Sequence, residues 1–433
     1  MMKAETPEII VRQWIAENAI PFDPDSDASL NEAIDRVVAS LGNDVRLLGF
    51  GEALHGGEDL LQLRNRIFQR LVDAHGYRAI AIESDFARGR IVSEYVSGRR
   101  PGGYDELVVP GFSYAFGTLT ANRELVEWMR AWNAEPDRKP IEWHAFDLPA
   151  THDANVASPR LLLEVALDFL DKMAIAGTPE RRARIVALLG DDVEWEQEAT
   201  WRPADPTLEM LERLDTLRIE IEDLISTLQI NLPELLPADE QRYHEALQHA
   251  VSARQVLTVL AALTRSSGWS EAQGVRDRLM ADQLAYISGR TAGKLFVFAH
   301  NAHLQRGKAE IPQQVGGGGN WAAGAHLHHR FGSGYAVIGT AVGRSDDNGI
   351  GAPEPGTLEA LLADAGSTSF LPARLSELPP IAAITSLPAR SPSATDLSYQ
   401  RLDARSFNHF DWLLMVNNVT GIRIEPGEPE ASS

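Results

Sequence analysis

Cysteine is missing from the 433-residue sequence. Its absence excludes disulfide bonds, thiolate metal sites and a cysteine nucleophile. Long apolar runs are missing too, because no segment approaches the roughly 20 apolar residues that a membrane-spanning helix needs. Residues 1–18 have the pattern of a short amphipathic helix and not of a signal peptide. We therefore expect a cytoplasmic protein that does not engage a membrane.

Basic residues are scarce relative to acidic ones. The chain has 40 lysine and arginine residues against 61 aspartate and glutamate residues, which gives a formal net charge of −21. A surface of this sign repels phosphate backbones, so no nucleic-acid partner is expected. Hydrophobic residues make up 44% of the sequence, an ordinary share for a globular protein with a sizeable core. The expected partner is a small-molecule substrate.

Short apolar runs bounded by glycine or polar residues predict buried parallel strands. They lie at residues 45–50, 78–82, 141–146 and 295–299, and a fifth at 335–340 joins them. Between the first two, apolar residues recur at helical spacing from Leu60 to Val72, and Gly76 stands where the helix would end. Strand, helix and strand in this order form a βαβ unit. The predicted fold class is α/β, with a mainly parallel central sheet flanked by helices.

The middle of the chain has helical apolar spacing throughout, which predicts an inserted helical lobe. We expect residues 1–157 to form the first part of the α/β core, residues 158–264 the lobe, residues 265–423 the second part of the core, and residues 424–433 a disordered tail. The glycine-rich stretch at residues 316–324 is expected to be a mobile loop. A substrate is expected between lobe and core, because clefts between two lobes are favoured ligand sites.

Charged or imidazole side chains follow four of the predicted strands. They are Glu52 and His55 after the first strand, Glu83 after the second, Asp147 after the third, and His300 and His303 after the fourth. Each group alone is compatible with a structural role, such as a helix cap or the partner of an arginine. Ligands of open α/β sheets, however, bind beyond the carboxyl ends of the strands. The coincidence therefore predicts one site built from distant segments.

Two kinds of chemistry fit this set of residues. In the first, a histidine is the general base that takes a proton from water, and a neighbouring glutamate fixes its tautomer. In the second, histidines and glutamates bind a divalent metal that lowers the pKa of a water molecule. Spacing alone does not separate them. A zinc site of three histidines would not need Glu52 and Glu83, whereas carboxylates beside a histidine raise its pKa and make it a stronger base. We therefore expect no bound metal and no cofactor.

Two common catalytic motifs are absent. No serine stands in a G-x-S-x-G pattern, and no G-x-x-x-x-G-K-[ST] phosphate loop occurs. Three histidines at positions 326, 328 and 329 resemble a metal tract only loosely. Arg64 and Arg66 lie on the predicted helix after His55, from which one of them could hold a carboxylate of the ligand.

The hexapeptide from Gly51 to Gly56 resembles the GE-x-x-HG signature of the erythromycin esterase-like family. The resemblance continues, in order, through most of the chain at Glu58, Arg64, Glu83, Asp147, Arg276-Asp277, His300-Asn301, His303 and Asp411. Leu54 departs from the pattern, because the family often has a small hydroxyl residue there.

This resemblance implies a hydrolase that cleaves a cyclic ester, in the best-known members a macrolide lactone, with a histidine-activated water. It implies His55 as the base and Glu83 as its carboxylate partner, with Glu52 and His300 completing the catalytic cluster. His303, Arg64 and Asp147 would bind or orient the substrate. A role in antibiotic resistance would follow. Three alternatives remain: a metal-dependent hydrolase, a natural-product enzyme of another reaction type, and a non-catalytic binding protein.

Overall fold

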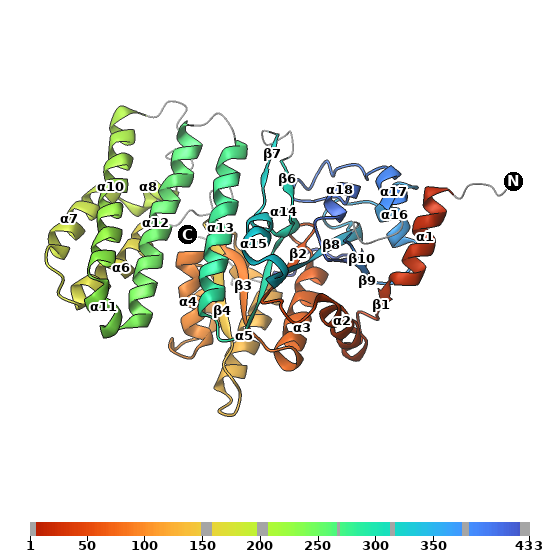
Figure 1. Ribbon diagram of the computed structural model, residues 1–433, viewed down its shortest axis with the longest axis horizontal. Helices are drawn as coiled ribbons and strands as arrows, with labels where there is room; N and C mark the ends of the chain where they lie inside the picture. The colour runs from red at the N-terminus through yellow and green to blue at the C-terminus, as the bar shows by residue number, and fades with distance from the viewer. Residues whose placement is uncertain are drawn as a thin grey trace, which may run out of the picture.

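The computed structural model describes residues 6–148, 158–196, 207–265, 269–311, 317–374 and 381–424. A central sheet runs through the molecule, and a block of long helices stands at one side of it (Figure 1). The strand order is β1-β9-β10-β8-β2-β5-β3-β4. In chain order these strands are β1 (Ile20–Pro21), β2 (Leu47–Glu52), β3 (Tyr77–Asp85), β4 (Glu142–Asp147), β5 (Lys294–His300), β8 (Tyr335–Arg344), β9 (Ser369–Pro372) and β10 (Trp412–Asn418).

The predicted fold class is confirmed. All five predicted strands are present as the neighbours β8, β2, β5, β3 and β4, and each pairs with the next in parallel. Three strands were not predicted from the sequence: β10, which extends the parallel part beside β8, and the antiparallel strands β9 and β1 at that edge. A separate antiparallel pair formed by β6 (Lys308–Glu310) and β7 (Gly319–Trp321) was not predicted either.

Helices cover both faces of the sheet, which is why its strands are apolar on both sides. Phe50 and Phe296 pack into one core, with α2 (Asp27–Leu41), α3 (Glu58–Ala74), α4 (Phe86–Val96) and α5 (Thr120–Ala134). Leu47 and Val297 face the other core. That side is covered by α1 (Pro7–Asn18), α13 (Trp269–Arg290), α14 (Asn301–Leu304), α15 (Ala323–Phe331), α16 (Leu358–Ala363), α17 (Ile381–Ser386) and α18 (Ala404–Phe407).

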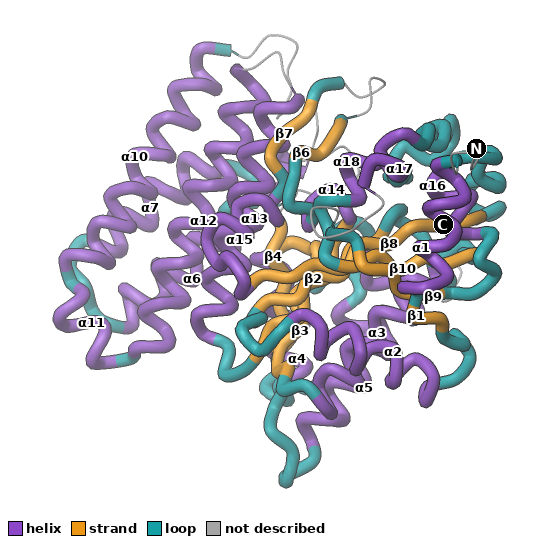
Figure 2. Tube along the Cα trace, turned by 45° about the vertical axis from the view of Figure 1, so that its right-hand side comes forward, coloured by secondary structure: helices purple, strands orange, loops and turns teal. Residues whose placement is uncertain are grey.

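A block of helices stands beside β4 (Figure 2). It has an apolar core of its own, in which Leu163, Leu224 and Leu257 are buried. Its described helices are α6 (Arg160–Lys172), α7 (Thr178–Leu189), α8 (Asp192–Glu196), α10 (Leu208–Ile230), α11 (Leu232–Ala238) and α12 (Glu240–Arg265). Helix α13 links the two parts, because Leu279 packs in the helical block and Leu284 under the sheet. The predicted boundary near residue 157 falls outside the described residues and stays a prediction.

The two stretches expected to lack order are partly structured. Gly319 belongs to β7 and Gly324 to α15, so this part of the expected mobile loop is regular. A Cβ atom on Gly319 would lie 2.7 Å from the carbonyl oxygen of Ala309, and one on Gly324 would clash with the backbone of Leu304. These glycines therefore permit close packing. Residues 312–316 and 425–433 lie outside the described residues. Ile424, the first residue of the expected disordered tail, forms an antiparallel bridge with Leu119 and is therefore ordered.

Within the described ranges, no helix has both the length and the apolar character that crossing a bilayer requires.

Candidate active site

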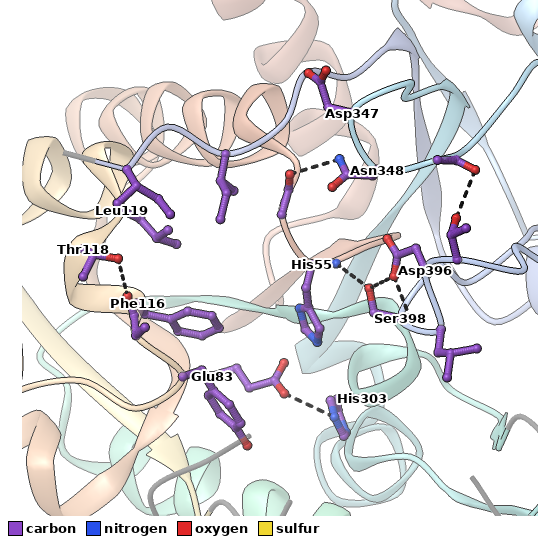
Figure 3. A pocket seen from close by; sticks show the side chains of 18 of the residues that line it. His55, Glu83, Phe116, Thr118, Leu119, His303, Asp347, Asn348, Asp396 and Ser398 are labelled. Atoms are coloured by element: carbon purple, nitrogen blue, oxygen red, sulfur yellow. Dashed lines mark hydrogen bonds and ion pairs between the residues drawn. The ribbon is translucent and has the colours of Figure 1, made fainter. Parts of the chain in front are cut away.

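A cavity of about 1120 Å³ opens at the carboxyl ends of the parallel strands (Figure 3). His55, Glu83 and His303 line its floor, with Arg276 from α13. Its walls are formed by four loops and the end of the described chain: Gly56; Tyr114, Ala115, Phe116, Thr118 and Leu119; Asp346, Asp347, Asn348 and Gly349; Thr395, Asp396, Leu397 and Ser398; and Ile422 and Ile424. No described residue of 158–264 is among them, and the position of a substrate between lobe and core stays a prediction.

Strand register brings the predicted residues together. Glu52 ends β2 directly opposite His300, which ends β5, and β3 with Glu83 lies on the other side of β5. The chain turns at the carboxyl ends of β2 and β5, and these turns place His55 and His303 beyond the ends of the two strands. The sequence prediction that Glu52, His55, Glu83 and His300 converge therefore agrees with the geometry, and the roles of the individual side chains can be read from their hydrogen bonds.

His55 has one nitrogen engaged and one facing the cavity. Its Nδ1 atom lies 2.6 Å from Oε1 of Glu52, and since a carboxylate only accepts, the ring proton sits on Nδ1. No hydrogen bond within the described part of the chain engages Nε2, and the side chain is 42% exposed. Burial lowers the pKa of His55, but the hydrogen bond and charge of Glu52 outweigh it and leave the pKa above its usual value.

His300 has both ring nitrogens engaged by backbone groups. Its Nε2–H donates to the carbonyl oxygen of Ser398 over 2.7 Å, and its Nδ1 accepts from the backbone N–H of Ala302 over 3.2 Å. Burial, with the nearby His55, lowers the pKa of His300 to about 3, so the ring is neutral. This ring has no lone pair or proton to exchange with a substrate. The catalytic role expected of His300 stays a prediction, and in this geometry its ring packs against that of His55.

His303 is held between two carboxylates. Its Nδ1 lies 2.6 Å from Oδ1 of Asp277 and its Nε2 lies 3.3 Å from Oε1 of Glu83. Burial opposes the charge on the ring, but Asp277 and Glu83 raise the pKa of His303 to about 10. Asp277 is itself fixed by the side chain of Asn320 and the backbone N–H of Ala323. Both carboxylates therefore favour the protonated form of His303, which borders the cavity.

Glu83 forms ion pairs with His303 and Arg276 and makes no hydrogen bond to His55. Its Oε2 accepts from the backbone N–H of His300 over 2.8 Å, and its Oε1 accepts from Arg276 Nη2 over 3.1 Å. Burial would raise the pKa of Glu83, but His303 and Arg276 hold it well below its usual value. The expected pairing of Glu83 with His55 is therefore not what the geometry shows: the carboxylate hydrogen-bonded to His55 is that of Glu52.

Arg276 is anchored by Asp147, which is fully buried behind it. Two hydrogen bonds of 2.8 and 2.6 Å join the guanidinium to both carboxylate oxygens. The hydroxyl of Tyr114 accepts from Arg276 over 3.1 Å and donates to Asp147 over 3.0 Å. Asp147 lies behind the cavity wall, so its expected contact with substrate is corrected to the positioning of Arg276. Nothing in the sequence marks Tyr114.

Arg64 also lies outside the cavity. Its side chain is fully buried, donates two hydrogen bonds to Oδ1 of Asn65, and stacks 4.8 Å from the ring centre of Phe298. Burial lowers its pKa to about 10. The expected contact of Arg64 with substrate is therefore wrong in this structure, because the side chain turns into the core beneath β2. Arg66 points away to Asp27 on α2.

The donors do not suit a zinc ion. A catalytic zinc takes three neutral imidazoles or carboxylates, whereas His300 has no free lone pair and His303 is cationic beside Arg276. Across the described ranges, no group of three histidine, aspartate or glutamate side chains is arranged to hold a metal ion. The three-histidine metal site weighed from the sequence therefore does not fit these residues.

Comparison with known proteins gives a consistent picture. The family model for erythromycin esterase matches residues 72–416. An erythromycin esterase type II of Escherichia coli is 20% identical over 308 residues, which cover 68% of this chain and 68% of that protein.

Solved structures share the fold. A Bacillus cereus protein covers 97% of this chain and 99% of its own, with a TM-score of 0.76 and 17% identity. A protein named for succinoglycan biosynthesis has a TM-score of 0.69 at 16% identity and covers 98% of this chain and 100% of its own. A mutant of the erythromycin esterase EreC in its open conformation has a TM-score of 0.64 at 17% identity over 89% of this chain and 93% of its own. Since the family model spans most of the sequence, the chain belongs to the erythromycin esterase family and is an esterase.

Proposed function

We propose that this esterase hydrolyses a cyclic ester, a lactone of the macrolide kind, with a water molecule activated by His55. The observation that carries the proposal is the hydrogen bond of 2.6 Å between His55 Nδ1 and Glu52. It commits the proton to Nδ1 and leaves the basic Nε2 atom to the cavity. A histidine with a raised pKa beside a carboxylate is a suitable general base near neutral pH.

The proposed reaction begins with water between Nε2 of His55 and the ester carbonyl. His55 takes one proton as the water oxygen bonds to the carbonyl carbon, and Glu52 stabilises the imidazolium. The negative charge that develops on the carbonyl oxygen faces the imidazolium of His303 and the guanidinium of Arg276. His55 then gives its proton to the alkoxide as the C–O bond breaks. One water is consumed, and the product is an open-chain hydroxy acid.

Two further observations support a large cyclic substrate. The cavity, at about 1120 Å³, exceeds the size typical for drug-like ligands. Relatives named for erythromycin esterase activity share either sequence or fold with this chain. Opening of a macrolide ring in the cytoplasm would confer resistance to that antibiotic, and we include this in the proposal.

Product mass tests the proposal. The purified protein is incubated with erythromycin, δ-valerolactone and an acyclic ethyl ester in water enriched in ¹⁸O. We expect a hydrolysed lactone to give one product heavier by one water, with the label in the new carboxylate, whereas cleavage of the ethyl ester would give a labelled acid and ethanol. His55→Ala should slow product formation by about 100-fold or more. Unchanged mass across the panel would indicate a binding protein. A product of different composition, such as an acyl transfer or elimination product, would assign the site to another reaction.

A further inference from the structure

The last described residues, Thr420–Ile424, cross the mouth of the cavity, and we refer to them as the C-terminal strap. The backbone N–H of Ile422 donates to the carbonyl oxygen of Gly56 over 3.1 Å, next to His55. On the other side, the N–H of Thr120 donates to Arg423 over 3.0 Å, and Ile424 pairs with Leu119. The strap thus joins the loop that carries the proposed base to the loop that precedes α5.

Acidic side chains hold the backbone of the strap in place. The N–H groups of Thr420, Gly421 and Arg423 donate to carboxylates over 2.6, 2.8 and 3.0 Å. The acceptors are Asp59, Asp347 and Glu58, in that order. Together with the bond from Ile422, four consecutive N–H groups are satisfied. A segment with this many backbone bonds is a built wall of the cavity and not a fraying end.

Gly421 allows the strap to lie close to the loop after β8, which contains Asp347. A Cβ atom at this position would stand 3.0 Å from the Cβ of Asp347, tighter than ordinary side-chain packing permits. A larger residue here would require Asp347 to shift, so glycine favours the close approach of the backbone to the loop after β8. Asn348 of that loop also donates to Gly56 over 3.1 Å, so strap and loop meet at the same carbonyl.

The isoleucines of the strap line the cavity and are left uncovered. Ile422 is 36% exposed and Ile424 is 59% exposed. Leu397, 44% exposed, lines the same cavity from another loop. Apolar side chains grouped at the mouth of a cavity lose contact with water only when a ligand with apolar surface covers them. The family match ends at residue 416, before the strap, so the strap is not part of what that match shares.

We propose that Ile422 and Ile424 form a lip that determines substrate specificity, by packing on an alkyl substituent that projects from the ester out of the cavity. The proposal rests on the proposed function, in that the ester is attacked at His55. It adds the residues that select one ester from another: an alkyl-substituted lactone gains contacts at the lip that an unsubstituted lactone of the same ring size does not reach.

The test compares δ-dodecalactone, which carries a heptyl chain, with δ-valerolactone, which has the same ring and no chain. We expect the wild-type protein to prefer δ-dodecalactone in kcat/KM. In the double variant Ile422→Ser with Ile424→Ser, the ratio of the two kcat/KM values should fall by about tenfold, mostly through KM, because two apolar contacts are lost. Ile422→Leu with Ile424→Leu keeps the apolar surface and should keep the ratio.

The matched control is Ile219→Ser with Ile230→Ser on α10. These isoleucines are 63% and 75% exposed but do not line the cavity, so the ratio should stay at its wild-type value. An equal loss of kcat/KM for both lactones in the lip variant would make the strap purely structural and overturn the proposal. An unchanged ratio would overturn it as well.

Failure of the proposed function is recognised separately. If the wild-type protein hydrolyses neither erythromycin nor the two δ-lactones, the reaction assigned to His55 is wrong. If only the δ-lactones fail to react, that reaction stands. In both cases calorimetric titration of δ-dodecalactone tests the lip alone. Binding that weakens in the serine variant but not in the α10 control supports the lip. Equal binding in both variants contradicts it.

Discussion

The imidazole rings of His55 and His300 lie 4.9 Å apart between their centres, yet only one of them can exchange a proton with a ligand. Nε2 of His300 donates to the carbonyl oxygen of Ser398, and Nδ1 accepts from the N–H of Ala302. Nδ1 of His55 is hydrogen-bonded to Glu52, whereas Nε2 faces the cavity. Two histidines that both follow strands of the sheet therefore differ in their capacity to exchange a proton, because their hydrogen-bond partners differ.

The first prediction separates the two histidines. His55→Ala should lower kcat by about 100-fold or more, as loss of a general base does. His300→Asn keeps an acceptor for Ala302 at the start of α14, and we expect a loss of kcat of about tenfold because the ring that packs on His55 is removed. Activity that survives in His300→Asn should show the wild-type pH midpoint. A shifted midpoint would make His300 the titrating base.

The pH profile itself is the second prediction. The base acts when deprotonated, so kcat/KM should rise with pH through the pKa of His55, at a midpoint above 6.5 because Glu52 raises that pKa. Glu52→Gln retains an acceptor for Nδ1 but removes the negative charge. The midpoint should then move to lower pH while kcat falls by roughly 10- to 100-fold. A midpoint that stays in place would mean that Glu52 does not act on the base.

The third prediction concerns the buried pair of Asp147 and Arg276. Asp147→Ala leaves a fully buried guanidinium with Glu83 as its remaining carboxylate. We expect the free energy of unfolding in urea to fall by about 3–5 kcal/mol, together with a loss of activity. The control is Asp35→Ala, which breaks a partly exposed pair with Arg70 and should cost about 1 kcal/mol or less. Equal losses in both variants would contradict the anchoring role of Asp147.

The charge on His303 yields a fourth prediction, for stability against pH. Its pKa is about 10 in the folded state and about 6.5 when unfolded. A raised pKa contributes stability that is fully present below pH 6.5 and is lost as the pH rises toward 10. His303→Gln removes this contribution, so its Tm should lie below the wild-type Tm at pH 6.5 by at least about 3 °C. The gap should narrow at pH 10, and a constant gap would argue against the imidazolium.

The fifth prediction uses two alanines with left-handed backbone. Ala115 in the cavity wall has φ of 56°, and Ala174 after α6 has φ of 54°. Replacement of either by glycine should relieve strain and raise the free energy of unfolding by about 0.5–1 kcal/mol. Only Ala115→Gly should also reduce kcat/KM, because the preceding Tyr114 loses a rigid neighbour while it holds Arg276. Reduced activity in both variants would remove the link to the cavity.

The sequence was sufficient to predict the central sheet, because its strands are buried on both faces and read as short apolar runs. It also placed Glu52, His55, Glu83, His300 and His303 at one edge, since parallel strands end together. Strand β10 was missed although four of its residues, Leu413 to Val416, form an apolar run. β9 and β1 are too short to stand out from loops.

The role of each side chain in the site could not be predicted from the sequence, and the reason is physical. Whether a histidine is a base, a cation or a packing partner depends on which acceptors surround its two nitrogens. For His300 one of these is the carbonyl of Ser398, nearly a hundred positions later. Arg64 was expected in the cavity because helical spacing allows it, but the deep position of its helix turns the side chain into the core. Tyr114 has no sequence signal, since its place is set by unusual backbone angles.

The position of β2 in the sheet has a consequence for synthesis on the ribosome. Leu47 of β2 pairs with Leu295 of β5 on one side and with Tyr335 of β8 on the other. Both partners are translated long after β2, and the strap that ties Gly56 comes later still. A nascent chain therefore carries the GEALHG segment without its native neighbours for most of translation. Pairings between such distant segments form slowly and leave apolar strands open to aggregation, so chaperone capture of the emerging chain should affect the yield of active protein.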